Sequence, residues 1–235
     1  MPRGAGRRQA GATGAKAKEN RMAELDHLVV GCLSLAEWRP RLEETFGVKA
    51  QGGGAHAGLG THNALWGLAR PGGGRCYLEL IAPDPGQGWP AEGPTPFGLG
   101  LPATQARLTD GPRLLTWVAR DPDAAALLAR GPAAMGPLRP MRRGDLEWRL
   151  ASPADGVPLM GGALPFVIEW PEGPTPSDTL AGSGLTLTGF ARRPDPEADA
   201  ALEAMGLAAL APVGETGGGA LRAEIEGPGG IVALN

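Results

Sequence analysis

The chain has 235 residues, of which 42% are hydrophobic and 20% charged, and this balance indicates a globular protein long enough to bury a sizeable core. Residues 1–21 carry six basic side chains and one acidic side chain, a net charge of +5. Because the whole chain has a net charge of −3, the remainder carries −8, and this acidic body argues against nucleic acid as a partner. No apolar stretch approaches the ~20 residues of a membrane span, and no signal-peptide core follows the basic head. We therefore expect a cytoplasmic protein with no membrane partner.

The basic head, residues 1–21, has no apolar periodicity and is expected to be disordered. An alternative interpretation is that translation starts at Met22, because the first predicted strand follows at once. The two cysteines, Cys32 and Cys76, lie in apolar runs and are expected to be buried free thiols in a reducing compartment.

Apolar runs and helical spacing predict a first round of elements after the head. These elements are a strand over 25–32, a helix over 35–46, a weak strand within 48–60, and strands over 61–68 and 76–82. Ser34 is placed to cap the helix, and Gly47 is placed to end it.

A connection rich in proline and glycine, over 84–112, separates this round from two further ones. The second round has strands over 114–119, 145–150 and 166–170 and a helix over 121–130 that begins at Asp121. The third round has a strand over 185–190, a helix over 196–205 closed by Gly206, and two strands near 220–226 and 231–234.

An internal repeat with a period of about 90 residues relates these rounds. Aligning the first strands pairs His27 with Thr116, and aligning the last strands pairs Glu79 with Glu169. One unit cannot cover both faces of its own sheet, so the units are expected to pair. The sequence predicts an α+β fold of two tandem βαβββ modules, over 23–83 and 113–171. A linker over 84–112 joins them, and a truncated third βαββ module over 184–235 follows.

Several motifs occur in a recognisable order and spacing. They are Leu25-Asp26-His27-Leu28-Val29-Val30, Gly60-Thr61-His62-Asn63-Ala64-Leu65, Tyr77-Leu78-Glu79-Leu80-Ile81-Ala82-Pro83, Leu114-Leu115-Thr116-Trp117 and Pro165-Phe166-Val167-Ile168-Glu169-Trp170. Together they resemble the glyoxalase-like domain family of the vicinal oxygen chelate (VOC) superfamily. The resemblance implies that curved mixed sheets of paired modules enclose a cavity. It also implies one divalent metal ion, which a small substrate chelates through two neighbouring oxygens.

In this resemblance the metal ligands come from the first and last strands of each module. They map onto His27 and Glu79 in the first module and onto Thr116 and Glu169 in the second. Imidazole and carboxylates suit Fe, Mn, Ni or Zn, so His27, Glu79 and Glu169 are the predicted ligands. Thr116 departs from the family pattern, because a neutral hydroxyl stands where a second histidine is usual. Glu79 and Glu169 are also the candidate catalytic acid and base, with structural ion pairs as the alternative.

Five residues are candidate contacts to the substrate, namely His62, Asn63, Trp66, Trp117 and Trp148. In a tight hairpin around the turn at 71–74, Trp66 lies opposite Glu79, and strand alternation places His62 on the same face. The tryptophans line either the hydrophobic core or an aromatic pocket.

These observations predict a protein that acts on a small oxygenated molecule by metal-assisted lyase, isomerase or dioxygenase chemistry. The alternative, which Thr116 favours, is a non-enzymatic protein of the same fold that binds and sequesters a small molecule. A third interpretation is a scaffold protein with a vestigial site. The chain is expected to work as a monomer or a homodimer. His56 falls in a glycine-rich stretch and is expected to be a solvated loop residue.

Overall fold

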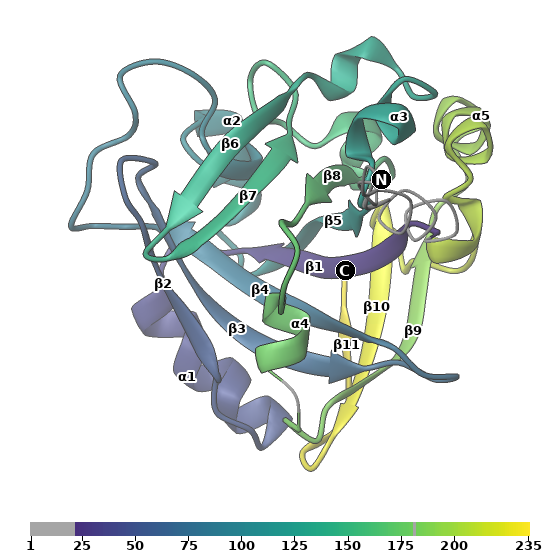
Figure 1. Cartoon of the computed structure of the whole chain (residues 1–235). Helices are drawn as coiled ribbons and strands as arrows, with labels where there is room; N and C mark the ends of the chain where they lie inside the picture. The colour runs from purple at the N-terminus through teal and green to yellow at the C-terminus, as the bar shows by residue number, and fades with distance from the viewer. Residues whose placement is uncertain (1–21, 181) are drawn as a thin grey trace, which may run out of the picture.

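The computed structural model describes residues 22–180 and 182–235, so the predicted disordered head lies outside the described residues. Within these residues eleven strands form one sheet with the order β11-β10-β9-β3-β4-β1-β5-β8-β7-β6, and β2 pairs with β3 (Figure 1). The predicted α+β class is confirmed at this level, as a large mixed sheet with helices packed around it. Across the part of the chain that the structure describes, no helix has the length and apolar character that crossing a membrane requires.

The elements follow one another as short strands and helices. The strands are β1 (Glu24–Gly31), β2 (Gly52–His56), β3 (Thr61–Ala69), β4 (Arg75–Pro83), β5 (Arg113–Arg120), β6 (Leu138–Arg143), β7 (Leu146–Ala151), β8 (Phe166–Glu169), β9 (Thr186–Arg192), β10 (Leu221–Gly227) and β11 (Gly230–Leu234). The helices are α1 (Leu35–Phe46), α2 (Pro102–Arg107), α3 (Ala124–Leu128), α4 (Pro176–Thr179) and α5 (Pro196–Met205).

Local signals explain where α1 begins and ends. The Ser34 side chain accepts a hydrogen bond from the backbone N–H of Glu37, which satisfies one of the free donors of the first turn. Gly47 follows the last turn with a φ of 68°, a left-handed conformation that glycine adopts without steric cost. Both ends are therefore where the sequence predicts them.

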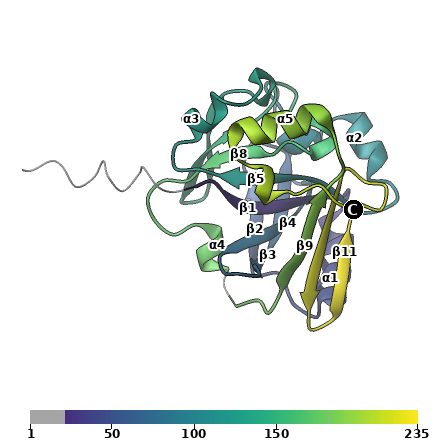
Figure 2. The same cartoon turned by 90° about the vertical axis from the view of Figure 1, so that its right-hand side faces the viewer.

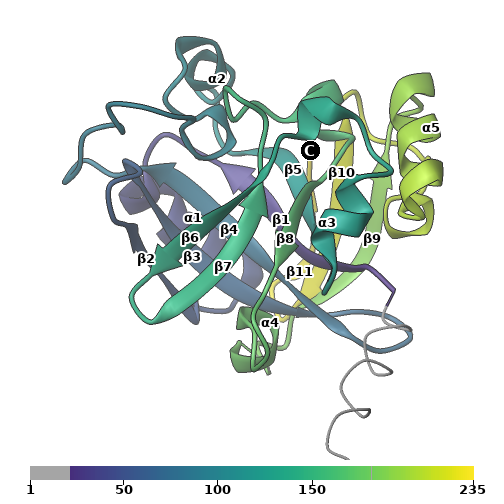
Figure 3. The same ribbon diagram turned by 45° about the horizontal axis from the view of Figure 1, so that its top comes forward.

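The two central strands, β1 and β5, run antiparallel and join two halves of the sheet. In one half β1 pairs in parallel with β4, and in the other β5 pairs in parallel with β8. Each half continues through an antiparallel neighbour, β3 beside β4 and β7 beside β8. The outer strands β2 and β6 come close to each other, so the sheet curves and its halves face one another (Figure 3).

The C-terminal strands do not repeat this arrangement. β9 pairs directly with β10 as an antiparallel neighbour, and β11 lies outside β10. These three strands join the rest of the sheet where Thr186 of β9 pairs with Ala69 of β3 (Figure 2). At the end of the chain, the Asn235 carbonyl accepts a hydrogen bond of 2.9 Å from the N–H of Leu114 in β5. The element order matches the predicted βαββ unit, whereas the strand pairing differs from that of the first half. The boundaries between units stay a prediction.

The larger of the buried hydrophobic clusters lies on one face of the central strands, and a smaller one that includes Val29, Ile81 and Val118 lies on the other. In the larger cluster, the core, buried residues of β1, β3, β4 and β5 pack with α1, α5 and β10, among them Leu28, Val30, Phe46, Trp66, Leu68, Leu78, Trp117, Leu202 and Ile225. Cys32 and Cys76 belong to this core, and burial raises the pKa of each thiol to about 12. Neither thiol is therefore a nucleophile at neutral pH.

Three local predictions need correction. The helix predicted over 121–130 is only Ala124–Leu128, and Asp123 rather than Asp121 caps it by accepting from the Ala126 N–H. The predicted linker contains the helix α2, and the second half contains a strand, β6, that has no predicted counterpart. Pro140 and three arginines break the apolar pattern of β6, because this strand lies at the edge of the sheet.

Gly67 in β3 offers a test of this packing. A Cβ at this position would lie 1.8 Å from the carbonyl oxygen of Leu180, just after α4. We expect Gly67→Ala to lower the free energy of unfolding by about 1–3 kcal/mol, because the backbone after α4 would have to move. Urea denaturation measures this, with Gly88→Ala as the control, since a Cβ at Gly88 meets nothing within 4 Å. Equal effects of the two substitutions would contradict the packing of this segment on β3.

Candidate functional site

A cavity of about 250 Å³ lies on the face of β1, β3 and β4 opposite the core, under the hairpin of β6 and β7. Its wall is largely apolar and aromatic, supplied by Leu65, Ile81, Phe97, Met141, Trp148, Leu150, Phe166, Ile168 and Trp170. Its polar lining side chains include one connected group, which we call the polar corner: His27, His56, Asn63, Glu79 and Arg143. A concave, largely apolar site with a few converging polar groups is the usual form of a small-molecule site.

His27 lies between two carboxylates at the centre of the polar corner. Its Nδ1 is 2.7 Å from Oδ1 of Asp26, and its Nε2 is 3.4 Å from Oε2 of Glu79. Burial lowers the pKa of His27, but the two carboxylates outweigh burial and raise the pKa to about 9. The Tyr77 ring stacks on the imidazole at 4.4 Å between centroids. His27 is therefore an imidazolium at neutral pH, held in a fixed orientation.

Glu79 is the anionic partner of this imidazolium. Burial raises the pKa of its carboxyl, but the contacts with His27 and Asn63 outweigh burial and lower the pKa to about 2. Its Oε1 accepts a hydrogen bond of 2.5 Å from the Asn63 amide, and its side chain is buried. Glu79 is thus a carboxylate at neutral pH, with acceptor capacity left for a ligand that lies in the cavity.

Asn63 connects the rest of the polar corner. Its Oδ1 accepts from the Gly54 N–H at 3.0 Å and from the Arg143 guanidinium at 2.8 Å. These two donors orient the amide, so its Nδ2 faces Glu79 at 2.5 Å and Nε2 of His56 at 3.2 Å. Nε2 of His56 therefore acts as an acceptor, its Nδ1–H donates to Thr61, and burial lowers the pKa of this histidine.

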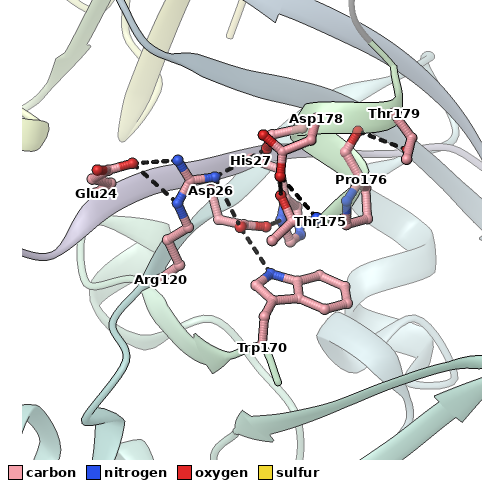
Figure 4. Close-up of polar contacts among 10 residues, drawn as sticks. Glu24, Asp26, His27, Arg120, Trp170, Thr175, Pro176, Asp178 and Thr179 are labelled. Atoms are coloured by element: carbon pink, nitrogen blue, oxygen red, sulfur yellow. Dashed lines mark hydrogen bonds and ion pairs between the residues drawn. The ribbon is translucent and has the colours of Figure 1, made fainter. Parts of the chain in front are cut away.

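Asp26 ties the polar corner to the cavity wall. Besides His27, its buried carboxylate accepts a hydrogen bond of 2.9 Å from the indole N–H of Trp170, a residue that lines the cavity. Arg120 lies 3.7 Å from the same carboxylate and also binds Glu24 and Ser177. Figure 4 shows Asp26 between Arg120, His27 and Trp170. One carboxylate thus positions both a central polar residue and an aromatic wall of the cavity.

Two of the predicted substrate contacts, His62 and Trp66, lie on the wrong face of β3 for that role. Leu65, rather than Trp66, pairs with Glu79, so the register differs by one residue from the predicted hairpin. A shift of one residue exchanges the two faces of a strand. Trp66 therefore packs in the core, its indole N–H bonded to the Val48 carbonyl, and His62 shares its face. Asn63 lines the cavity, and its contact with a substrate stays a prediction.

The other two predicted tryptophans divide between core and cavity. Trp117 is fully buried in the core, where its indole N–H donates to the Ala163 carbonyl at 3.1 Å, so it does not line the cavity. Trp148 does line the cavity and lies 5.6 Å from Trp170, centroid to centroid. His56, predicted to be solvated, is 7% exposed and lines the cavity at the end of β2.

Glu169 is not part of this site. Its carboxylate binds Arg149 and accepts a hydrogen bond from the Ala124 N–H at the start of α3. The strand register explains the error. Val29, two residues after His27, pairs with Glu79, whereas Val118, two residues after Thr116, pairs with Phe166. The residue that corresponds to Glu79 is therefore Phe166, which lines the cavity as an apolar wall.

The described residues do not complete a metal site. His27 and Glu79 stand together, but Glu169 is elsewhere and the Thr116 hydroxyl faces backbone carbonyls. Within residues 22–180 and 182–235 no three His, Cys, Asp or Glu side chains gather as metal ligands would. Protein metal sites with two donors from the chain are unusual, because catalytic sites commonly use three. The donor set therefore does not fit a metal ion held by the chain alone.

Sequence patterns could have identified some of the site residues that were missed. Trp170 follows the last strand of the second half, in register with the cavity-lining Phe166 and Ile168, so alternation points to it. Arg143 and His56 reach the site only because β2 and β6 approach each other, and no local sequence pattern encodes this long-range contact.

Comparison with solved structures places the fold among known ones. A hypothetical protein from Staphylococcus aureus is 12% identical, with a TM-score of 0.51 over 92% of this chain and 86% of its own. A variant of Streptomyces coelicolor methylmalonyl-CoA epimerase in complex with 2-nitronate-propionyl-CoA is 19% identical, with a TM-score of 0.41 over 63% of this chain and 96% of its own. A methylmalonyl-CoA epimerase in complex with methylmalonyl-CoA and NH4+ is 19% identical, with a TM-score of 0.43 over 66% and 100%.

Comparison with sequences is decisive for the family. No curated protein matches the chain. The family described as a glyoxalase-like domain matches residues 25–207, which span well over half of the chain and run from within β1 to just past α5. The chain therefore belongs to the glyoxalase-like domain family, within the vicinal oxygen chelate superfamily, as its motifs predicted.

Proposed function

We propose that this protein binds a small, largely apolar molecule that carries two neighbouring oxygens. The observation that supports this most is the composition of the cavity, in which an aromatic wall faces a single polar corner. The apolar body of the ligand packs against Trp148, Trp170 and Phe166. Its oxygens lie at Glu79 and Arg143, where one carboxylate accepts and one guanidinium donates.

The charge state of the polar corner favours binding over proton transfer. A general base works best when its pKa lies near the working pH, whereas the pKa of Glu79 is lowered to about 2. A general acid is equally disfavoured, because the pKa of His27 is raised to about 9. The pair instead offers a fixed anionic acceptor, which suits recognition of a hydroxyl. We propose no catalytic role for Glu169, which does not line the cavity and binds Arg149 instead.

Two matched ketones test this proposal by isothermal titration calorimetry. α-Hydroxyacetophenone carries a hydroxyl beside its carbonyl, and acetophenone has the same apolar body without the hydroxyl. We expect the hydroxyketone to bind about tenfold more tightly, since a hydrogen bond to a charged group contributes at least about 1.5 kcal/mol. Glu79→Leu should abolish the preference, whereas His62→Ala, on the other face of β3, should keep it. Absence of binding, or equal affinity for the two ketones, would contradict the proposal.

Metal-assisted chemistry on such a molecule is a second candidate function, and one observation favours it. Nε2 of His27 and Oε2 of Glu79 lie 3.4 Å apart, close to the separation of about 3.4 Å between two ligands that share one tetrahedral ion. Metal analysis of the purified protein and of His27→Ala separates the candidates. We expect less than stoichiometric metal, and hydroxyketone binding that survives treatment with a chelator. Stoichiometric metal that is lost in His27→Ala would favour the enzyme instead.

A further inference from the structure

We propose that the ligand of this cavity is an organic acid, whose carboxylate is held by Arg143 with support from Arg139. This proposal rests on the proposed small-molecule binding function and narrows its ligand class. Arg143 is half-buried beside Asn63 in the polar corner, and Arg139 lies exposed at another part of the cavity wall.

The alternation of β6 turns one side of this edge strand toward the cavity. Arg139, Met141 and Arg143, which share one face of the strand, line the cavity, and the Pro140 ring between them also reaches it. Arg142 does not line the cavity, and its guanidinium donates to the carbonyl of Gly144 within the hairpin. On the face that a ligand would contact, the strand therefore presents Arg139 and Arg143, with the apolar side chain of Met141 between them.

Neither cavity-lining arginine is neutralised by the protein. Among the described residues, no carboxylate oxygen lies within 4.0 Å of either guanidinium, whereas Arg120 and Arg149 each bind a glutamate. The imidazolium of His27 and the carboxylate of Glu79 offset each other's charge. The remaining charged side chains of the cavity are the two arginines and the exposed Glu92. Counted over the side chains that line the cavity, the two arginines against Glu92 leave a net charge of +1, and the Asp26 carboxylate lies behind His27 without lining the cavity.

The geometry of Arg143 suits a carboxylate next to a hydroxyl. One of its N–H groups donates to Oδ1 of Asn63 at 2.8 Å, so the guanidinium is oriented and its other donors stay available. The planar guanidinium matches a carboxylate with two parallel hydrogen bonds. Asn63 also contacts Glu79, so a hydroxyl next to that carboxylate would lie near an anionic acceptor. A 2-hydroxy acid with an apolar body satisfies both groups. Arg139 is about 13 Å further along the strand, which makes its contribution the smaller one.

Mandelate and its neutral amide, mandelamide, test this inference by calorimetry. They share the phenyl body and the hydroxyl and differ in the carboxylate. We expect mandelate to bind about tenfold more tightly at low salt, with the preference shrinking as salt is added. Arg143→Met should abolish the preference and Arg139→Met should reduce it. Arg142→Met, on the same strand, should leave it unchanged and serves as the matched control.

The amide separates failure of this inference from failure of the proposed function. A thermal melt of each variant, and retained mandelamide binding, establish that the cavity is intact. If mandelamide binds and mandelate binds no better, the organic-acid inference is overturned while the proposed binding function stands. If Arg142→Met removes the preference as completely as Arg143→Met, the effect is one of net charge and the assignment to the cavity is wrong. If neither compound binds, the proposed function fails together with the inference.

Discussion

Asp26→Asn is expected to lower the free energy of unfolding by about 3–5 kcal/mol, because it removes one charge from a buried network and leaves the others without their partner. The Asp26 side chain is fully buried, and it contacts the His27 imidazolium, the Trp170 indole and Arg120. An amide cannot accept both hydrogen bonds in the same geometry, so either His27 or Trp170 loses its acceptor. Urea denaturation measures the change.

Glu24→Gln is the matched control, because Glu24 binds the same arginine from the surface. Its side chain is 54% exposed, and an ion pair of that kind contributes about 0–1 kcal/mol. A small effect of Asp26→Asn, similar to that of Glu24→Gln, would mean that the Asp26 network does not hold the site together. Asp26→Asn should also lower ligand affinity more than Glu24→Gln does, since only Asp26 positions residues that line the cavity.

Stability should depend on pH through the His27–Glu79 pair, with a maximum between about pH 4.5 and 6.5. The pKa of Glu79 is lowered from 4.5 to about 2, so its contribution is complete above pH 4.5 and is lost as the pH falls toward 2. The pKa of His27 is raised from 6.5 to about 9, so its contribution is complete below pH 6.5 and is lost as the pH rises to 9. Each limb corresponds to a loss on the order of 3 kcal/mol.

Two variants identify the source of each limb. In His27→Gln the decline between pH 6.5 and 9 should flatten, because no imidazolium is left to titrate. In Glu79→Gln the acid limb should flatten, and the alkaline limb should end at a lower pH and be smaller, because one of the two carboxylates that raise the pKa of His27 is gone. Unfolding free energies from urea titrations across this range provide the measurement. An alkaline limb of unchanged slope in His27→Gln would show that another group titrates there.

The elements that the sequence predicts well are those with strong local signals. Ser34 and Gly47 predict the bounds of α1, and Gly206 predicts the end of α5; in the structure Ser34 caps its helix and the two glycines follow the last turns. The strand β6 could not be predicted in this way, because two of its three cavity-facing alternate residues are arginines and the cavity exists only in the folded protein.

The errors in the site come from register, which local patterns do not determine. The turn after β3 contains Gly72, Gly73 and Gly74, all with positive φ, and the length of this turn decides whether Leu65 or Trp66 lies opposite Glu79. One residue of difference sends Trp66 into the core. In the second half, paired residues of β5 and β8 are 48 positions apart, against 50 for β1 and β4, so Phe166 stands at the position equivalent to Glu79 and Glu169 lies three residues further along.

A measurement on the tryptophan side chains tests the central claim most directly. The six tryptophans give separate indole N–H resonances in a two-dimensional proton–nitrogen NMR spectrum, and single Trp→Phe variants assign them. Titration with mandelamide should shift the resonances of Trp148 and Trp170, which line the cavity, and leave those of Trp66 and Trp117 in place, because these two pack in the core. Shifts at Trp66 and Trp117 with none at Trp148 and Trp170 would contradict the assignment of the ligand site to this cavity.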